Sequence, residues 1–125
     1  MWGTGTPRRE FLYSDDMADA CVFLMNLDEQ RYGALLGSDE SVTGRFEPPL
    51  VHVGVGEDLT IAELAEQVRR SVGYAGQVVY DTSKPDGTPR KLMDVGLINA
   101  AGWRASTPLA VGLAAAYAEF KATHP

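Results

Sequence analysis

The stretch LVHVGVGEDLTIAELAEQVRRSV, residues 50–72, decides the fold class because it joins a strand pattern directly to a helix pattern. Its first seven residues form an apolar run that is short enough for a buried strand and ends in glycines, where the backbone turns tightly. Thr60 and Glu63 have the spacing of a capping box, and apolar residues then recur on one face of a predicted helix over 61–72. Gly73 stands where a left-handed residue ends such a helix. A strand that leads into an amphipathic helix indicates an α/β fold.

Upstream of this stretch, the sequence predicts a loop, a short strand and a helix. Turn-forming residues reach to Pro7, and the large apolar residues at 11–13 suit a strand. Asp15 or Asp16 can cap a helix over about 16–27, in which apolar residues recur at helical spacing: Met17, Ala20, Cys21, Leu24 and Met25.

Two further segments lack a regular pattern. Residues 28–49 show no sustained period and are predicted to form a long loop. After another predicted strand over 77–80, residues 81–91 contain two prolines and one glycine, which exclude a regular helix or an inner strand. This second segment is therefore expected to be a shaped loop.

The end of the chain predicts two helices. Asp94 can cap a short helix that ends at Gly102. Thr107 then provides a capping residue before Pro108 at the first position of a terminal helix, whose apolar residues are Leu109, Leu113, Ala116, Tyr117 and Phe120.

Length and composition predict one soluble domain over residues 1–125. Hydrophobic residues make up 45% of the 125 residues, which suits a globular core. No run of eighteen apolar residues occurs, and the first residues contain no apolar segment of the signal-peptide type. We expect a cytoplasmic protein with no membrane partner.

The cysteine and the histidines suggest neither a disulfide framework nor a metal site. Cys21 lies on the apolar stripe of its helix without a basic neighbour to activate it, so we expect a small buried thiol. His52 falls in a predicted strand, where we expect a structural role, and His124 is far away in sequence. No metal is predicted.

The charge distribution leaves two interpretations open. The net charge of −6 argues against nucleic-acid binding, which depends on basic side chains. Five of the eleven basic residues nevertheless fall in two short segments: Arg8, Arg9, Lys84, Arg90 and Lys91. Such patches suit a small anionic ligand, or they are ordinary solvated loops, which composition by itself favours.

The pattern Gly54-Val55-Gly56 after a strand invites comparison with a dinucleotide-binding turn, but the match fails. The position of the third glycine is Leu59, and Glu57 and Asp58 add negative charge where a phosphate would lie. We therefore predict an ordinary turn and no cofactor-binding residue.

Three segments together resemble the extended short-chain dehydrogenase/reductase superfamily, and most closely its GDP-L-fucose synthase branch. They are WGTGTPRREFLYSDDMA (residues 2–18), VGVGEDLTIAELA (53–65) and KPDGTPRKLMD (84–94), with Gly102-Trp103 downstream. The third segment is the most specific of the three.

The resemblance implies that the chain corresponds to the carboxy-terminal, substrate-binding part of such an enzyme, a small lobe with α+β character. In the family, the preceding part holds the NADP(H)-binding Rossmann domain, the residues for hydride transfer, and the cysteine and histidine for epimerisation. Cys21 and His52 do not match those two residues. The resemblance thus assigns no catalytic residue to this chain and implies that it is inactive alone.

The resemblance also implies the substrate contacts. The full enzyme epimerises GDP-4-keto-6-deoxy-D-mannose and reduces it with NADPH to GDP-L-fucose. The family's contacts fall on Trp2, Arg9, Asp86 and Lys91. Arg9 and Lys91 are expected to hold the diphosphate of the GDP-sugar, Trp2 to form an apolar wall, and Asp86 to accept hydrogen bonds from the ligand. The expected partners are the GDP-sugar, the missing Rossmann domain and, in the full-length chain, a second copy.

Two alternatives remain. The chain could be part of another sugar-nucleotide epimerase or dehydratase of the same superfamily. It could also be a non-catalytic remnant or interaction module that folds alone.

Overall fold

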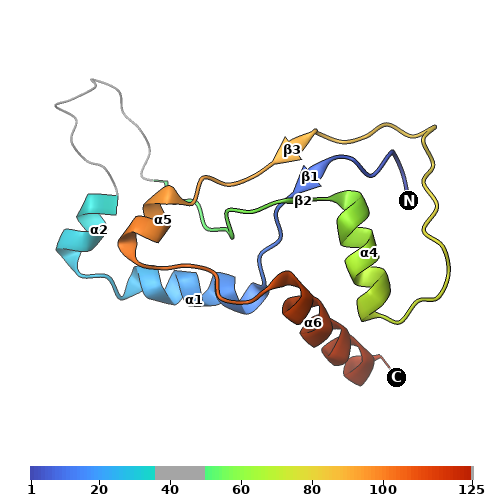
Figure 1. The fold of residues 1–125 in the computed structure, drawn as a ribbon. Coiled ribbons are helices and arrows are strands. Elements are labelled where there is room, and N and C mark those ends of the chain that lie inside the picture. The colour runs from blue at the N-terminus through green and yellow to red at the C-terminus, as the bar shows by residue number, and fades with distance from the viewer. Residues whose placement is uncertain (36–49, 125) are drawn as a thin grey trace.

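The computed structural model describes residues 1–35 and 50–124, which form three very short strands and five helices in an α/β arrangement (Figure 1). In chain order these elements are β1 (Arg8–Arg9), α1 (Ser14–Met25), α2 (Glu29–Leu35), β2 (Leu59–Thr60), α4 (Ile61–Ser71), β3 (Arg90–Lys91), α5 (Gly96–Ala101) and α6 (Leu109–Thr123). The predicted α/β class is confirmed.

The sheet has the order β2-β1-β3, so the strand that comes first in the chain lies in the middle. β1 pairs antiparallel with β2, and Arg8 lies opposite Thr60. β1 pairs parallel with β3, and Arg9 lies opposite Lys91. Backbone bonds extend this pairing beyond the strands, since the Arg8 amide donates to the Pro89 carbonyl at 2.8 Å.

The first residues run alongside residues 79–81 in the same manner. The amino group of Met1 donates to the Val79 carbonyl at 2.5 Å, and the Asp81 amide donates to the Met1 carbonyl at 2.7 Å. The Gly3 amide donates to the Asp81 carbonyl at 2.9 Å. Segments 1–9 and 79–91, far apart in sequence, are therefore joined by backbone bonds at both of their ends.

Helix α4 forms as the capping-box pattern predicts. The Glu63 amide donates to the Thr60 hydroxyl at 3.1 Å, and the Thr60 amide donates to the Glu63 carboxylate at 2.7 Å. Gly73 has a φ of 69°, which is the left-handed geometry expected after the helix.

The three predicted strands are wrong in position. Residues 11–13, 50–56 and 77–80 form no strand, and pairing occurs instead at the two-residue strands. Leu12, Val51 and Val53 are partly buried against the core cluster as extended chain, so their apolar character reflects packing rather than membership of a sheet.

Helix α1 begins two residues before the prediction, and its polar residues act differently. Tyr13 is the N-cap without a side-chain cap bond, so the predicted cap at Asp15 or Asp16 is wrong. Asp16 is buried and bonds to another segment instead. Cys21 is exposed, which corrects the expected buried thiol.

Three other expectations change at loops and helix starts. The predicted loop over 28–49 is wrong for Glu29–Leu35, which form α2, where Asp28 caps the first turn by accepting from the Arg31 amide at 2.8 Å. The rest of that range, 36–49, lies outside the described residues. The predicted short helix is α5, but its N-cap is Val95 rather than Asp94, which accepts from the Gly96 amide at 2.9 Å. Helix α6 starts at Leu109, with Pro108 as its N-cap rather than its first residue.

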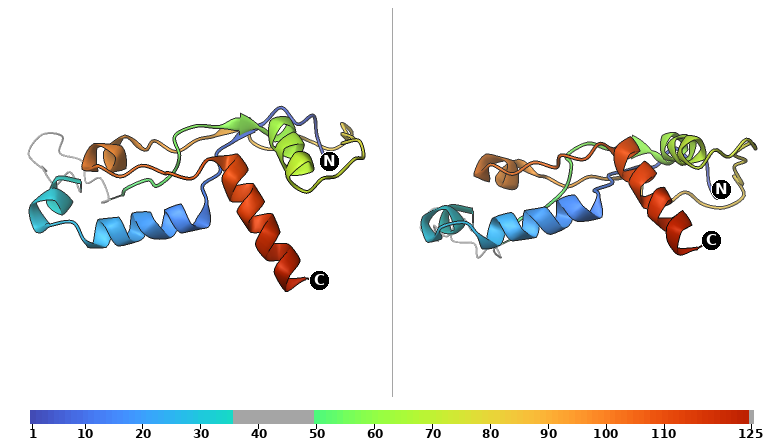
Figure 2. Two further views of the ribbon diagram at one scale, coloured as in Figure 1. Left: turned by 60° about the horizontal axis from the view of Figure 1, so that its bottom comes forward. Right: turned by 90° about the horizontal axis from the view of Figure 1, so that it is seen from below.

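The core is small for a chain of this size. Its buried cluster consists of Ala20, Val95, Ile98 and Trp103. The accessible surface is 9074 Å², whereas a compact monomer of 13.5 kDa would expose about 6,500 Å². The views in Figure 2 show why, since the helices spread outward from a flat sheet and α6 ends at a tip of the molecule.

Within residues 1–35 and 50–124, no helix has both the length and the apolar character required to span a membrane.

Candidate functional site

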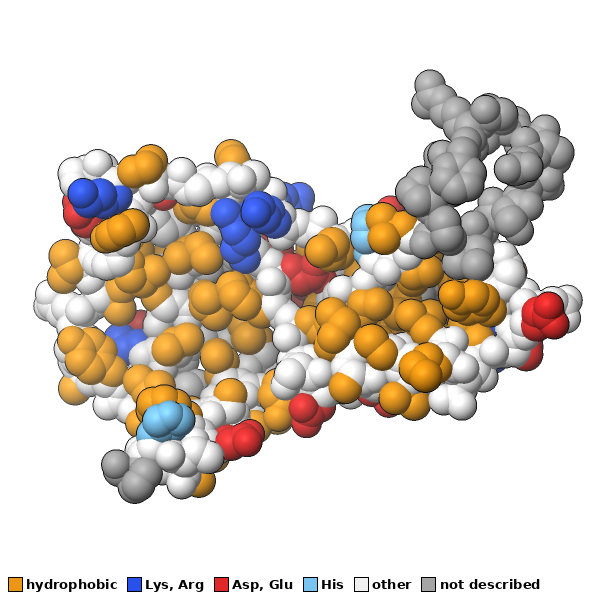
Figure 3. Space-filling view, turned by 180° about the vertical axis from the view of Figure 1, so that it is seen from behind, with side chains coloured by type: hydrophobic (Ala, Val, Ile, Leu, Met, Phe, Trp, Pro, Cys, Tyr) orange, Lys and Arg blue, Asp and Glu red, His pale blue; other side chains and the backbone are white. Residues whose placement is uncertain are grey.

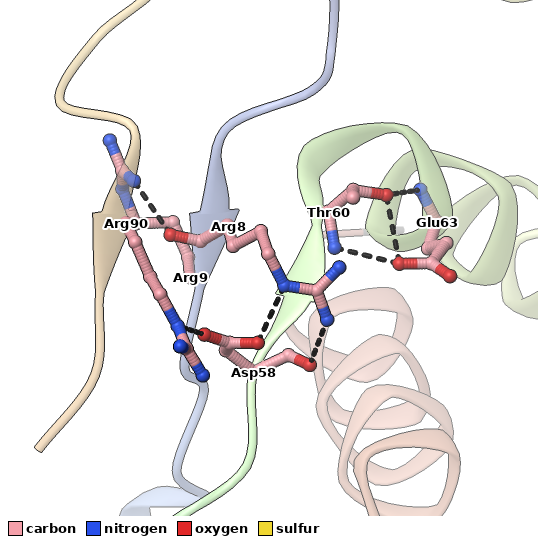
Figure 4. A network of polar contacts seen from close by, with 6 residues as sticks. All are labelled: Arg8, Arg9, Asp58, Thr60, Glu63 and Arg90. Atoms are coloured by element: carbon pink, nitrogen blue, oxygen red, sulfur yellow. Dashed lines mark hydrogen bonds and ion pairs between the residues drawn. The ribbon is translucent and has the colours of Figure 1, made fainter.

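Arg9 on the central strand β1 and Lys91 on the edge strand β3 lie side by side. They are direct partners in the parallel β1–β3 register, and partners in such a pair have their side chains on the same face. Figure 4 shows the Arg9 side chain directed away from Asp58, on which Arg8 and Arg90 converge. The two predicted cations therefore share the opposite face of the sheet from that cluster.

Neither of these two side chains has a described acidic partner. The ion pairs found among residues 1–35 and 50–124 involve Arg8, Arg69, Arg70 and Arg90, but not Arg9 or Lys91. The Arg9 guanidinium donates one bond to the Arg8 carbonyl at 2.7 Å, which leaves other N–H groups for a ligand. An arginine fork beside a lysine ammonium can hold a diphosphate.

Gly87 lets the neighbouring loop approach the Arg9 guanidinium. A Cβ atom at Gly87 would lie 3.1 Å from Arg9 Nη2, closer than ordinary van der Waals contact. The loop over 84–89 is thus packed directly against the cation.

Asp86 is already engaged by the protein. Its Oδ1 accepts from the Thr4 amide at 2.8 Å, and its Oδ2 accepts from the Thr4 hydroxyl at 2.7 Å. These bonds hold the pKa of Asp86 below its ordinary value. Gly3, with a φ of 76°, makes room for the carboxylate. Asp86 therefore ties the 84–89 loop to the first residues, with one lone pair per oxygen left for a ligand.

Trp2 is exposed to 77% and lies near the other end of this pair of segments. It forms a parallel bridge with Asp81, and the Lys84 ammonium lies 6.0 Å from the centre of its ring. Such an exposed indole can stack on a planar or apolar ligand group. All four predicted contact residues thus lie along segments 1–9 and 81–91.

The glycine turn at Gly54-Val55-Gly56 is filled by a carboxylate of the chain itself. Glu10 Oε1 accepts from the Gly56 amide at 2.6 Å, and Oε2 accepts from the Met93 amide at 2.9 Å. A Cβ atom at Gly54 would overlap with this carboxylate. The turn that superficially suggests a dinucleotide site therefore does not fit a pyrophosphate, whose charge Glu10 would repel.

Asp58 connects all three strands on the face opposite Arg9. It accepts from Arg8 Nε at 2.7 Å and from Arg90 Nε, and its carbonyl accepts from Arg8 Nη2 at 2.9 Å (Figure 4). The bonds from Arg90 and Arg8 hold the pKa of Asp58 below its ordinary value, although burial opposes them. Only 3% of the Asp58 side chain is exposed.

The long-range contacts of Asp58, Glu10 and Asp16 were not predicted from the sequence. Their donors are dozens of positions away, so only the fold reveals them. His52, expected inside a strand, is exposed and lies in none. No cluster of three or more potential metal ligands occurs among the described residues.

Two tyrosines are each followed by a lysine four residues later, and the sequence analysis did not consider them. The pairs are Tyr80 with Lys84 and Tyr117 with Lys121. The first is not helical, so its members do not share a helix face. The second lies on the outer part of α6, where the Lys121 ammonium stacks on the Tyr117 ring at 4.7 Å. Neither pair belongs to β1 or β3, the strands that carry Arg9 and Lys91.

Comparison with known proteins defines the class. Residues 1–34 match the model of the NAD dependent epimerase/dehydratase family. A crystal structure of a GDP-6-OMe-4-keto-L-xylo-heptose reductase from Campylobacter jejuni matches 99% of this chain and 34% of its own, with a TM-score of 0.85 and 35% identity. A GDP-mannoheptose C4 reductase from the same organism, with NADP bound, matches 97% of this chain and 34% of its own, with a TM-score of 0.75 and 33% identity. The chain is a relative of the extended short-chain dehydrogenase/reductase enzymes.

The particular resemblance is to GDP-L-fucose synthase. The chain is 46% identical to the GDP-L-fucose synthase of Escherichia coli (strain K12) over 122 residues, which are 96% of this chain and 35% of that protein. The resemblance deduced from the three motif segments is confirmed. The chain spans about a third of the length of these relatives.

Proposed function

We propose that the chain is the GDP-sugar-binding part of a GDP-L-fucose synthase. Such an enzyme epimerises GDP-4-keto-6-deoxy-D-mannose and reduces it with NADPH to GDP-L-fucose. The observation that carries the proposal is the direct pairing of Arg9 with Lys91 on one face, without a described carboxylate to neutralise them. Trp2 and Asp86, along the same two segments, would contact the rest of the ligand.

The chain alone would bind the GDP-sugar weakly and would not convert it. Its glycine turn is occupied by Glu10, so NADP(H) would bind to the part of the enzyme that this chain does not span. A site between two lobes also loses one wall when a lobe is absent. We accordingly assign Trp2, Arg9, Asp86 and Lys91 to substrate binding and no residue to catalysis or cofactor binding.

The exposed apolar surface supports a second folded unit as partner. Figure 3 shows hydrophobic side chains over much of one face. A groove of about 440 Å³ beside α4 is lined mainly by apolar side chains, among them Leu64, Val68 and Val79. We infer that the Rossmann domain covers such surface in a complete cytoplasmic enzyme, in which a homodimer would also form.

Binding of GDP tests the assignment of the two cations. Titration calorimetry or NMR titration should detect GDP binding to the wild-type chain, weakened by about tenfold or more in the double variant Arg9→Ala, Lys91→Ala. The matched control is Arg69→Ala, Arg70→Ala, which removes the same charge from α4, where both arginines pair with Glu66. Equal affinities for the wild type and the Arg9/Lys91 variant would refute the proposed site.

Two further measurements separate the alternatives. Tighter binding of a UDP- or dTDP-sugar than of any GDP-sugar would assign the chain to another branch of the superfamily. A monodisperse, cooperatively folding chain with no nucleotide affinity would favour an interaction module. NADPH-dependent turnover of the keto-sugar by the chain alone would contradict the proposed inactivity.

A further inference from the structure

Four cationic side chains occupy the paired positions of β1 and β3. Arg8 lies opposite Arg90, and Arg9 lies opposite Lys91. Because successive side chains in a strand point to opposite faces, each face of this two-strand unit carries two neighbouring cations. Like charges that lie directly opposite each other destabilise strand pairing, so both faces work against the register that the structure shows.

Asp58 removes this repulsion on one face. Its two carboxylate oxygens are divided between the arginines, with Oδ1 accepting from Arg8 and Oδ2 from Arg90. The Asp58 side chain is 3% exposed, whereas those of Arg8 and Arg90 are 43% and 60% exposed, so the carboxylate is buried between two arginines that reach the surface. Asp58 also belongs to the segment that enters β2 at Leu59, and it therefore connects all three strands at one point.

The strands themselves provide few backbone bonds to keep this register. β1 and β3 have two residues each, and even a complete two-stranded hairpin is marginally stable in water. On the other face, Arg9 and Lys91 have no described carboxylate between them. The Asp58 bridge is thus a side-chain contact that opposes separation of β1 from β3 at these positions, and the bond from the Met93 amide to Glu10 joins the same segments just beyond them.

We propose that Asp58 is a positioning residue for the anion site, because its bridge between Arg8 and Arg90 fixes the register that holds Arg9 beside Lys91. Asp58 lies on the far face of the sheet and does not contact the ligand. The identity of the ligand, a nucleoside diphosphate, rests on the proposed function, whereas the effect of Asp58 on the register does not.

GDP is the probe for the first test, and Asp58→Asn is the variant. The asparagine has the same shape but leaves two adjacent arginines without a counter-charge. We expect Asp58→Asn to weaken GDP binding by about tenfold. Glu63→Gln is the matched control, since it removes a nearby carboxylate that caps α4 and does not bond to either arginine, and it should change the affinity by less than about threefold.

A neutral replacement of the whole bridge distinguishes positioning from a general loss of structure. The triple variant Arg8→Gln, Asp58→Asn, Arg90→Gln removes the repulsion together with the bridge. We expect its GDP affinity to return to within about threefold of the wild-type value. Affinity as weak as that of Asp58→Asn, in spite of the neutral bridge, would overturn the proposal.

The register itself is measured by NMR, independently of any ligand. Cross-strand backbone contacts between Arg9 and Lys91 should be present in the wild type, lost in Asp58→Asn and recovered in the triple variant. Their persistence in Asp58→Asn would overturn the proposal even if GDP binding fell. If the wild type failed to bind GDP, the proposed function would be wrong, and these contacts alone would decide whether Asp58 fixes the register.

Discussion

The carboxylate of Asp16 lies against Thr107, which is 91 positions further along the chain. Asp16 Oδ2 accepts from the Thr107 amide at 2.8 Å, and Oδ1 accepts from its hydroxyl at 3.0 Å. The amide and hydroxyl of Ser106 donate to the same carboxylate at 3.2 and 3.1 Å. The first turn of α1 is thereby fastened to the segment that leads into α6.

Replacement of Asp16 by asparagine should destabilise the fold. The side-chain NH2 group of asparagine would face the N–H and O–H donors of Ser106 and Thr107, so some of these donors would lose their acceptor. We expect the free energy of unfolding, measured by urea denaturation, to fall by about 2–4 kcal/mol. Asp15→Asn is the control in the same turn, where the exposed carboxylate accepts only from Ser14 at 3.3 Å. Equal effects of the two substitutions would contradict the role of Asp16.

Stability should decrease in acid for the same reason. Burial by itself would raise the pKa of Asp16, but the bonds from Thr107 and Ser106 outweigh it and hold the pKa below the ordinary value of 3.8. A carboxyl group with a lowered pKa in the folded state stabilises the fold fully above its unfolded pKa, and this contribution is lost as the pH falls through the folded pKa. Urea midpoints between pH 7 and pH 2 should therefore decline below about pH 4. In Asp16→Asn the urea midpoint should decline less steeply as the pH falls. A decline as steep as that of the wild type would show that Asp16 is not the source of the acid sensitivity.

Gly54 should not tolerate a methyl group. A Cβ atom there would lie 2.9 Å from the Glu10 carboxyl carbon, so Gly54→Ala must displace the carboxylate from the Gly56 amide. We expect a loss of about 1–3 kcal/mol in unfolding free energy. At Gly33, within α2, a Cβ atom would meet nothing within 4 Å, and Gly33→Ala should instead stabilise the fold by about 0.5–1 kcal/mol. If Gly54→Ala lowers the unfolding free energy while Gly33→Ala raises it, steric contact explains the first change and helix propensity explains the second.

Thr60→Ala should loosen the start of α4. Without the hydroxyl, the Glu63 amide loses its acceptor, and the expected cost is about 1 kcal/mol. Amide hydrogen exchange of the first turn of α4 is the direct measurement, with faster exchange expected at Glu63. Thr60→Ser keeps the hydroxyl and should exchange as the wild type does. If serine and alanine had the same effect, the capping box would not stabilise the helix.

Helix α4 could be predicted with its boundaries because everything that determines it is local. Thr60 and Glu63 start the helix, and Gly73 follows its end in left-handed geometry. The strands could not be located in this way. A strand of two residues has almost no period, and the partners of β1 are about 50 and 82 positions away. The apolar segments that looked like strands lie against helices instead.

Within the proposed site, only the residues expected to face the ligand could be predicted from the sequence. Arg9 and Lys91 were identified from their motifs, and the register places them side by side. Asp58 was read as negative charge in a turn that would repel phosphate, because nothing in its neighbourhood pointed to Arg8 or Arg90. Glu10 was hidden for the same reason, since its donors are Gly56 and Met93.

The central place of β1 in the sheet has a consequence for how the chain folds. A strand that precedes both of its partners in the chain must wait for residues 59–60 and 90–91 before it has neighbours on both sides. Closing such long loops costs entropy before any contact is gained, so the helices are expected to form early and the sheet late. During that interval the cluster of arginines has no register, and the capacity to bind an anion emerges only in the final step of folding.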